Sequence, residues 1–182
     1  MLFDDFYDAI RARLADASAV DLDRLCTTLG SVPGARRKVI VAGNGGSAAI
    51  ASHVSVDLTK ALAIRAISFN EADLITCFGN DYGYDQWLAK AIEAYADPGD
   101  VAVLISSSGQ SPNIVNAARA AKVLGLTVVT LSGFDAANPL RTLGDQNLWT
   151  DSRNYNVVES VHQTWLLACL ERLMAQTAGR AQ

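Results

Sequence analysis

Apolar residues in the first thirty positions recur at helical spacing. They lie three or four residues apart with acidic and basic residues between them, which predicts an amphipathic helix. Its apolar face consists of Leu2, Phe3, Phe6, Ile10 and Leu14. Asp21 is a candidate N-cap for a second, shorter helix that runs to Leu29 and is ended by Gly30 and Pro33.

From residue 38 onward the pattern changes to short β-branched runs, each followed by small residues and then by a helical stretch. The predicted strands are Val39–Ala42, Ala66–Phe69, Val101–Ile105 and Thr127–Leu131. Their hydrophobicity is nearly continuous, which is typical of parallel strands that are buried on both faces. Strands that alternate with helices predict an α/β fold, here a three-layer sandwich. No linker divides the chain, so we expect one domain over residues 1–182.

The last predicted helix, Val157–Gln176, is apolar on more than one stripe. Its apolar residues are Val158, Val161, Trp165, Leu166, Leu167, Ala168, Cys169 and Leu170. A helix that only packs on its own sheet needs a single apolar stripe. We therefore expect another subunit to cover part of this helix.

The composition supports a folded domain and excludes several classes of partner. Of the 182 residues half are hydrophobic, and 15 basic and 19 acidic side chains give a formal net charge of −4. This balance provides no general attraction for nucleic acid or for acidic membrane surfaces. Arg36, Arg37 and Lys38 form the only basic run, which we expect to be a solvated corner.

Cysteine usage and the N-terminus predict a reduced, cytoplasmic protein. Cys26, Cys77 and Cys169 are far apart in the sequence, and their spacing suits neither a zinc site nor a redox pair. The N-terminus is acidic and aromatic, unlike a secretory leader. No stretch reaches the roughly eighteen apolar residues that a membrane span requires.

Two loops between a strand and a helix have the composition of phosphate sites. The first contains Gly43 and then Asn44, Gly45, Gly46 and Ser47, and the second contains Ser106, Ser107, Ser108, Gly109, Gln110 and Ser111. At the carboxyl edge of a parallel sheet, free backbone N–H groups and helix N-termini favour an anion, and serine hydroxyls add neutral donors. The alternative is that Ser111 is an N-cap before Pro112 and the glycines only close turns.

The first loop also matches the G-x-G-x-x-A pattern of dinucleotide-binding proteins. Gly43 to Ala48 supplies the pattern, and Glu71 after the next strand could bind a ribose. This interpretation leaves the serine-rich second loop without a role, because a pyrophosphate needs only the first. The G-x-x-x-x-G-K-[ST] loop of nucleotide triphosphatases does not occur.

The chain has two histidines, and each lies within one helical turn of a carboxylate. His53 precedes Asp57 by four residues and Glu159 precedes His162 by three, so each pair shares a helix face. An aldose–ketose isomerisation needs a base that moves a proton between carbons and a second group that moves protons between oxygens. Asp57 or Glu159 is a candidate base, and His53 or His162 a candidate proton carrier. The same four side chains could instead bind a metal, or be an exposed ion pair and a core histidine.

Residues 77–85 predict a polar, glycine-punctuated loop before a helix that contains Trp87. Within it, Asn80 and Asp81 could hydrogen-bond sugar hydroxyls. They could equally form a turn and a helix cap, because Asn and Asp favour such turns without a ligand.

Taken together, these motifs resemble the sugar isomerase (SIS) domain family, and most closely its phosphoheptose isomerase branch. The glycine loop, the His53 and Asp57 pair, the Asn80 and Asp81 segment and the serine loop stand in the family's order over nearly the whole chain. The resemblance implies a five-stranded parallel flavodoxin-like sheet with added N-terminal helices. It further implies a homotetramer, with residues 1–33 used in oligomerisation and sites shared between subunits.

The same resemblance implies a phosphorylated sugar as ligand and the conversion of sedoheptulose 7-phosphate to D-glycero-D-manno-heptose 7-phosphate, for lipopolysaccharide or capsule precursors. By position, Asn44, Gly45, Gly46, Ser47 and Ser106, Ser107, Ser108, Ser111 would contact the substrate and its phosphate, and Asn80 and Asp81 would line the sugar site. A zinc ion would be bound by His53, Asp57, Glu159 and His162, although a usual zinc ligand of the family, the histidine of the last helix, aligns with Leu167. Either zinc or no cofactor is expected.

The sequence departs from the family's pattern at three of these positions. Asp57 stands where a glutamate is usual, Glu159 replaces a glutamine, and Leu167 replaces a histidine of the last helix. A leucine can neither bind a metal nor transfer protons, and His162, one turn away, is a candidate substitute. A second function therefore also fits the resemblance: a non-catalytic phosphosugar-binding regulator or scaffold, like the branch that binds a replication initiator.

Overall fold

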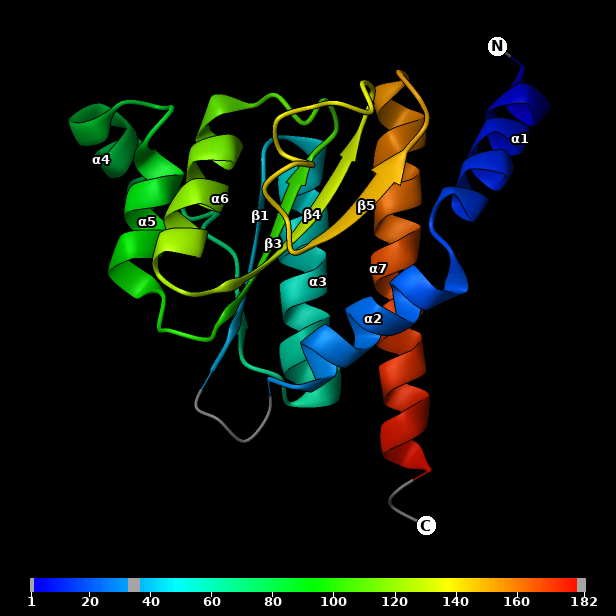
Figure 1. Ribbon diagram of the computed structural model, residues 1–182, viewed down its shortest axis with the longest axis horizontal. Helices are drawn as coiled ribbons and strands as arrows, with labels where there is room; N and C mark the ends of the chain where they lie inside the picture. The colour runs from blue at the N-terminus through cyan, green and yellow to red at the C-terminus, as the bar shows by residue number, and fades with distance from the viewer. Residues whose placement is uncertain (1, 33–36, 180–182) are drawn as a thin grey trace.

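A five-stranded parallel sheet forms the centre of the computed structural model, which describes residues 2–32 and 37–179 (Figure 1). The strand order is β2-β1-β3-β4-β5, and every neighbouring pair is parallel. The strands are β1 (Val39–Gly43), β2 (Ala66–Ile67), β3 (Val101–Ser106), β4 (Thr127–Gly133) and β5 (Gln146–Thr150). The predicted α/β class with a five-stranded parallel sheet is confirmed.

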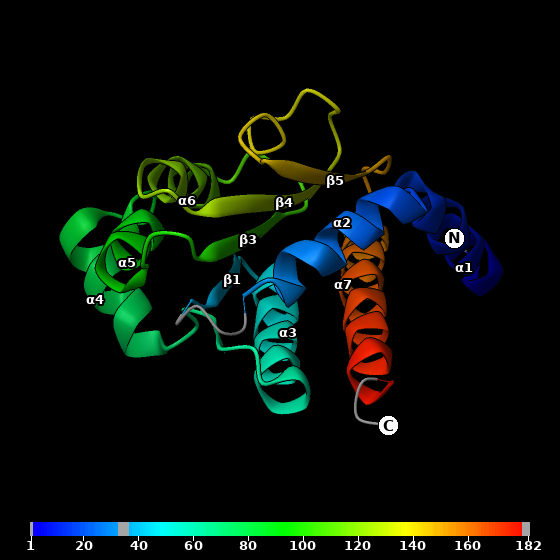
Figure 2. The same ribbon diagram turned by 60° about the horizontal axis from the view of Figure 1, so that its bottom comes forward.

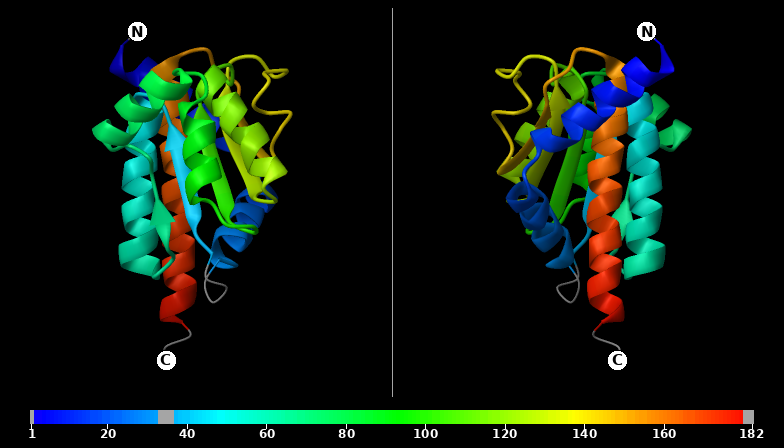
Figure 3. Two further views of the ribbon diagram at one scale, coloured as in Figure 1. Left: turned by 90° about the vertical axis from the view of Figure 1, so that its left-hand side faces the viewer. Right: turned by 90° about the vertical axis from the view of Figure 1, so that its right-hand side faces the viewer.

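Helices cover both faces of this sheet, which gives three layers (Figures 2 and 3). One face carries α2 (Ala19–Gly30), α3 (Gly46–Leu62) and α7 (Tyr155–Ala178), with α1 (Phe3–Arg13) and a short 3₁₀ helix (Leu14–Asp16) beside α7. The other carries α5 (Trp87–Tyr95) and α6 (Pro112–Val123), with α4 (Ala72–Tyr82) outside them. No helix in these described ranges has the length and hydrophobicity of a membrane span.

The alternation of side chains along each strand separates the two layers of core. Val39 and Val41 of β1 pack with α3 and α7, whereas Ile40 and Ala42 pack with α5 and α6. In register, Val39 pairs with Val101 and Ile40 with Ala102, so the same parity holds across the sheet. Successive strand side chains point to opposite faces of the sheet. The same alternation continues into the loops that follow the strands and determines which loop residue faces which helix.

One strand was missed by the sequence prediction and another is shorter than predicted. β5 was not predicted, because Gln146–Thr150 is an edge strand in which buried and more exposed residues alternate, unlike the continuous runs of the inner strands. β2 contains only Ala66 and Ile67, although four residues were predicted. The last helix runs two residues further at each end than expected, from Tyr155 to Ala178.

Two helix assignments were wrong at the level of local contacts. Ser18, not Asp21, caps α2: its Oγ accepts a hydrogen bond from the Asp21 backbone N–H at 3.2 Å, and the Asp21 carboxylate accepts one from the Ser18 N–H at 3.1 Å. Cys77–Tyr82, predicted as loop, is the second half of α4. There Leu74, Ile75 and Phe78 pack against the core, and that packing outweighs the turn preference of the segment.

The basic run before β1 is not a solvated corner at Lys38, whose side chain is buried. Its Nζ lies 2.6 Å from Asp100 Oδ2 and 2.7 Å from Asp97 Oδ2, and the buried Asp100 also accepts from the Lys38 backbone N–H at 2.8 Å. Burial alone would lower the pKa of Lys38, but its hydrogen bonds to Asp100 and Asp97 outweigh that and raise it. Arg36 and Pro33 lie outside the described residues.

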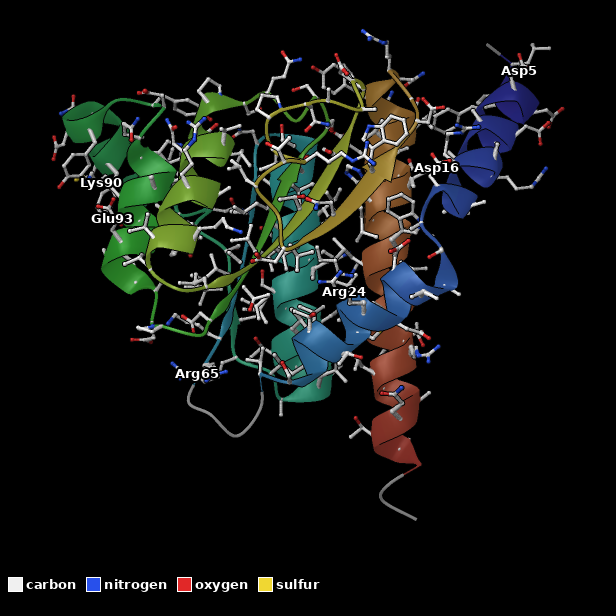
Figure 4. All side chains as sticks on the ribbon, in the orientation of Figure 1. Asp5, Asp16, Arg24, Arg65, Lys90 and Glu93 are labelled. Atoms are coloured by element: carbon white, nitrogen blue, oxygen red, sulfur yellow. The ribbon has the colours of Figure 1, made fainter. Side chains whose placement is uncertain are left out.

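Polar contacts attach the N-terminal helices to the rest of the domain, although α1 buries no residue of its own. The Asp16 carboxylate accepts a hydrogen bond from the Asp151 backbone N–H at 2.8 Å, and Arg24 donates to the Asp145 carbonyl at 3.0 Å. Both side chains are seen on the α1–α2 segment in Figure 4. In the core, Trp165 of α7 donates its indole N–H to the Leu14 carbonyl at 3.0 Å.

Candidate functional site

The two predicted anion loops lie side by side at the carboxyl edge of the sheet. Gly43, the last residue of β1, pairs in register with Ile105 of the adjacent β3, so both loops begin at the same level. A reciprocal amide pair joins them: Asn44 and Asn113 each donate their Nδ2 to the other's Oδ1 at 2.9 Å. Tyr84, which precedes α5, donates its hydroxyl to Asn44 Oδ1 at 3.3 Å.

The serine loop points its hydroxyls to both sides of the sheet. Ser106 donates to Ser111 Oγ at 3.1 Å on the side of α6, whereas Ser107 donates to Glu159 Oε1 at 3.4 Å on the side of α7. This follows from strand alternation, because Ser106 continues the parity of Ala102 and Leu104, and Ser107 that of Val103 and Ile105. The loop therefore has neutral donors towards α6 and faces a carboxylate towards α7.

The role of Ser111 distinguishes the two interpretations of the second loop. Ser111 occupies the N-cap position of α6, with Pro112 in the first turn, but its side chain makes no capping hydrogen bond. Its hydroxyl instead belongs to the group formed with Ser106, at the positive end of the α6 dipole. A cluster of hydroxyls at a helix N-terminus is suited to an anion.

Glu159 lies against the N-terminus of α3. The helix begins after Gly45, whose φ of +55° favours glycine, and no side chain caps it. A Cβ added at Gly46 would collide with the Glu159 carboxylate, so the close approach depends on glycine at this position. The free N–H groups and the positive end of the helix dipole favour a negative group here. The first loop thus positions a carboxylate as well as an open anion site.

His53, on the second turn of α3, has one partner for each ring nitrogen. Its Nε2 lies 3.2 Å from Asp57 Oδ2, and its Nδ1 lies 3.3 Å from Nε2 of Gln163 on α7. Nearly half of the His53 side chain is exposed, at 46%. The predicted His53 and Asp57 pair is therefore formed, and a residue of a second helix joins it.

A groove of about 620 Å³ runs between α3 and α7 and connects these groups. Its lining residues are Phe6, Gly46, Ala49, Ile50, His53, Asn156, Glu159, Ser160 and Gln163. Figure 3 shows the two helices side by side, running in the same direction. The candidate base Glu159 and the candidate proton carrier His53 therefore open onto one cavity.

His162 does not reach this groove, which corrects the expectation that it could serve beside His53. It is completely buried, and its Nε2 lies 3.1 Å from the Ser132 carbonyl oxygen of β4. Burial lowers the pKa of His162 to about 4, although the hydrogen bond to Ser132 acts in the opposite direction. It is a core histidine, and we leave it out of the groups that we propose for proton transfer or metal binding.

The zinc set that the resemblance implies does not fit the residues found here. In the described part of the chain no three His, Cys, Asp or Glu side chains converge as metal ligands would. His53 and Asp57 pair with each other, His162 is turned into the core, and Leu167 packs against the apolar cluster around α7. We derive no step through a metal.

Asn80 and Asp81 lie on the last turn of α4, both exposed, where Asn80 donates to Asp81 Oδ1 at 2.9 Å. They do not line the groove between α3 and α7, and their role at a sugar site stays a prediction. Glu71, the candidate ribose-binding acid, precedes α4 and lies beside β2, which is the edge strand opposite β5.

Sequence reasoning missed three polar residues that the structure brings to the site. Asn113 is buried and pairs with Asn44, but neither its burial nor this partner, sixty-nine positions away, can be read from the sequence. Gln163 lies four residues after Glu159, on the same helix face. Tyr84 gave no signal, because its contact with Asn44 spans forty positions of sequence.

Comparison with known proteins gives a consistent result. The model of the SIS domain family matches residues 3–133. The phosphoheptose isomerase of Halorhodospira halophila is 35% identical over 182 residues, which cover 94% of this chain and 91% of that protein. The phosphoheptose isomerase of Fusobacterium nucleatum is 35% identical over 140 residues, 74% of this chain and 72% of the relative.

Solved structures agree with these sequence matches. The phosphoheptose isomerase of Neisseria gonorrhoeae superposes with a TM-score of 0.87 at 26% identity, and the match covers 95% of both chains. That of Francisella tularensis superposes with a TM-score of 0.86 at 27% identity, over 96% of this chain and 94% of that chain. The likeness therefore extends over the sheet and the helices of both layers.

Proposed function

Because this chain belongs to the SIS domain family, we propose that it is a phosphosugar isomerase of the aldose–ketose type that converts sedoheptulose 7-phosphate to D-glycero-D-manno-heptose 7-phosphate. Relatives and solved structures named phosphoheptose isomerase cover nearly the whole chain. The observation that carries the mechanism is the position of Glu159. It lies where the two anion loops meet and opens onto the same groove as His53.

The substrate phosphate is held on the α6 side of the sheet edge. Ser106, Ser108 and Ser111 offer hydroxyls there, and the positive end of the α6 dipole favours the anion. Asn44, fixed by Asn113, and the backbone of Gly45, Gly46 and Ser47 complete the cradle from β1. Donors without charge hold the phosphate, while the Glu159 carboxylate lies on the opposite side, where it does not repel the phosphate as strongly.

The reacting carbons lie on the α3 and α7 side. Glu159 removes a proton from C1 of the open-chain ketose, and the product of this step is the C1=C2 enediolate with its charge on O2. Glu159 then returns its proton to C2 while the O1 proton passes to O2, which leaves the aldehyde at C1. The net change moves one hydrogen from C1 to C2 and one proton from O1 to O2.

His53 carries the protons of the two oxygens. Asp57 accepts the Nε2 hydrogen and stabilises the protonated ring, as the carboxylate does in a catalytic triad. Nδ1 is then the nitrogen that faces α7 and exchanges protons with the sugar. Asp57 thus orients His53, and Glu159 acts as the base at carbon.

We extend the proposal to assembly and cellular role. Residues 1–33 and α7 build a homotetramer, in keeping with the exposed Leu2, Phe3 and Tyr7 on a helix that buries none of its residues. The enzyme acts in the cytoplasm and supplies heptose precursors for lipopolysaccharide or capsule. Light scattering of the purified protein tests the tetramer, and deletion of residues 1–33 should lower the oligomeric state.

The activity is tested by mixing purified protein with sedoheptulose 7-phosphate and following the aldose 7-phosphate by NMR. In D₂O the product should contain deuterium at C2 wherever the proton on Glu159 exchanges with solvent. No turnover of this or related ketose phosphates, with or without added zinc, would reject the enzyme. The regulator or scaffold interpretation is not favoured, because a sensor has no use for a base and an oriented histidine in one groove.

A further inference from the structure

Gln163 is a polar groove residue of α7 whose side chain contacts His53. It lies one helical turn after Glu159 on α7, is half-buried, and lines the groove that both share. Its side-chain nitrogen lies 3.3 Å from His53 Nδ1. The mechanism above gives this amide no role, although it lies at the nitrogen that exchanges protons.

The chemistry of the two His53 partners fixes which atom donates. A carboxylate only accepts hydrogen bonds, so the nitrogen beside Asp57, Nε2, carries the ring hydrogen. In the neutral ring Nδ1 then has a lone pair, and the Gln163 amide donates to it. At 3.3 Å this is a long hydrogen bond, which a substrate oxygen can replace at little cost.

We propose that Gln163 is a further catalytic residue: its amide N–H binds the sugar oxygen that exchanges a proton with His53 Nδ1, and stabilises the negative charge that develops on that oxygen. The proposal rests on the isomerase function proposed above. His53 Nδ1 and Gln163 Nε2 lie 3.3 Å apart. A sugar oxygen can therefore lie about 2.9 Å from both nitrogens, which is hydrogen-bond distance. It would accept from the amide and share its proton with the imidazole.

The charge balance supports an amide at this position. When Glu159 removes the carbon proton, the electrons move to the carbonyl oxygen O2, which needs a donor until His53 Nδ1 has accepted the proton of the O1 hydroxyl and passed it to O2. An amide N–H supplies that donor without adding charge to a groove that is already lined by the Glu159 carboxylate. Because Gln163 and Glu159 share one face of α7, the donor and the base keep a fixed separation.

The test compares three variants with the wild-type protein. Gln163→Leu keeps the side-chain volume but removes the hydrogen-bond donor. Gln163→Glu keeps the side-chain shape but leaves only acceptors. The control, Gln176→Leu, makes the same change as the first variant at an exposed position between three and four turns further along α7. Removal of an oxyanion donor lowers kcat by about 100-fold or more, so we expect that loss for Gln163→Leu with KM changed less than about threefold. Gln176→Leu should match the wild type.

Binding measurements separate catalysis from structure. Calorimetry with two phosphates is the probe: the polyol phosphate, which has no carbonyl, and an aldonohydroxamate phosphate, which mimics the enediolate. Gln163→Leu should bind the polyol as the wild type does and the hydroxamate more weakly, by a factor close to its loss of kcat. Gln163→Glu should also lose kcat, because its carboxylate has no N–H to donate to the sugar oxygen.

The outcomes are distinguishable. A wild-type protein that turns over no ketose phosphate overturns the isomerase function and this inference with it. An active wild-type protein together with a Gln163→Leu variant of equal kcat and equal hydroxamate affinity overturns the inference alone. So does an equal loss of affinity for both phosphates, or a thermal unfolding midpoint lowered by Gln163→Leu and not by Gln176→Leu, because either would mean a structural role.

Discussion

The buried His162 makes the stability of this protein depend on pH in a predictable direction. Its Nε2 faces a carbonyl oxygen, that of Ser132, and so carries the hydrogen of the neutral ring. Its Nδ1 is buried and has no hydrogen-bond partner in the described structure. A second proton would therefore add a charge at a buried nitrogen with no acceptor in the described structure, and burial lowers the pKa of His162 to about 4.

The sign and the size follow from linkage. The pKa of the unfolded chain is near 6.5 and that of the folded protein is lower, so protons favour the unfolded state. The stabilising contribution is complete above pH 6.5 and is lost as the pH falls towards 4. With these two values the protein loses about 2 kcal/mol of unfolding free energy between pH 7.5 and pH 5, and about 3 kcal/mol in total.

Urea unfolding of wild type and His162→Gln at a series of pH values measures this contribution. Glutamine can donate to the Ser132 carbonyl but does not titrate, so its curve should be flatter by about 2 kcal/mol between pH 7.5 and 5. A His53→Gln variant removes the other histidine and controls for its titration, and protein concentration is held constant because assembly contributes to stability. Parallel curves for wild type and His162→Gln would refute the reasoning.

Three further predictions concern the site and the sheet. Glu159→Gln should lower kcat about 100-fold or more while phosphosugar affinity stays within about threefold, since the base is lost and the cradle is not; turnover near that of wild type in the NMR assay would assign the base elsewhere. Gly46→Ala should displace the Glu159 carboxylate, so kinetics should show a large loss of kcat while calorimetry shows little change in the thermal unfolding midpoint. An unchanged kcat would contradict the predicted collision. Asp100→Ala leaves the buried Lys38 with one exposed partner and should cost about 3 kcal/mol in urea unfolding, whereas Glu93→Ala, in an exposed pair, should change little.

Local pattern was sufficient for the inner part of the fold. β1, β3 and β4 are nearly continuous buried runs, because both faces of an inner parallel strand are covered by helices and neither face contacts solvent. β5 was not predicted because an edge strand mixes polar and apolar residues. The second half of α4 was predicted as a loop because core contacts, not local propensity, make residues 77–82 helical. Lys38 was misplaced because its partner Asp100 is sixty-two positions away.

At the site, the sequence by itself determined the two loops and their neighbourhood. Glycine and serine that follow buried parallel strands indicate candidate anion loops, and adjacent parallel strands bring such ends together. The pairing of His53 with Asp57 also followed from spacing on one helix.

Only the tertiary structure decided which polar side chains of α7 line the groove. His162 and Gln163 are neighbours in sequence, yet one is fully buried under β4 and the other faces His53, because consecutive residues of a helix point about 100° apart. Which of them meets the site depends on how α7 is rotated against α3 and the sheet. That rotation is set by packing between elements more than a hundred residues apart, and such packing leaves no mark in local sequence.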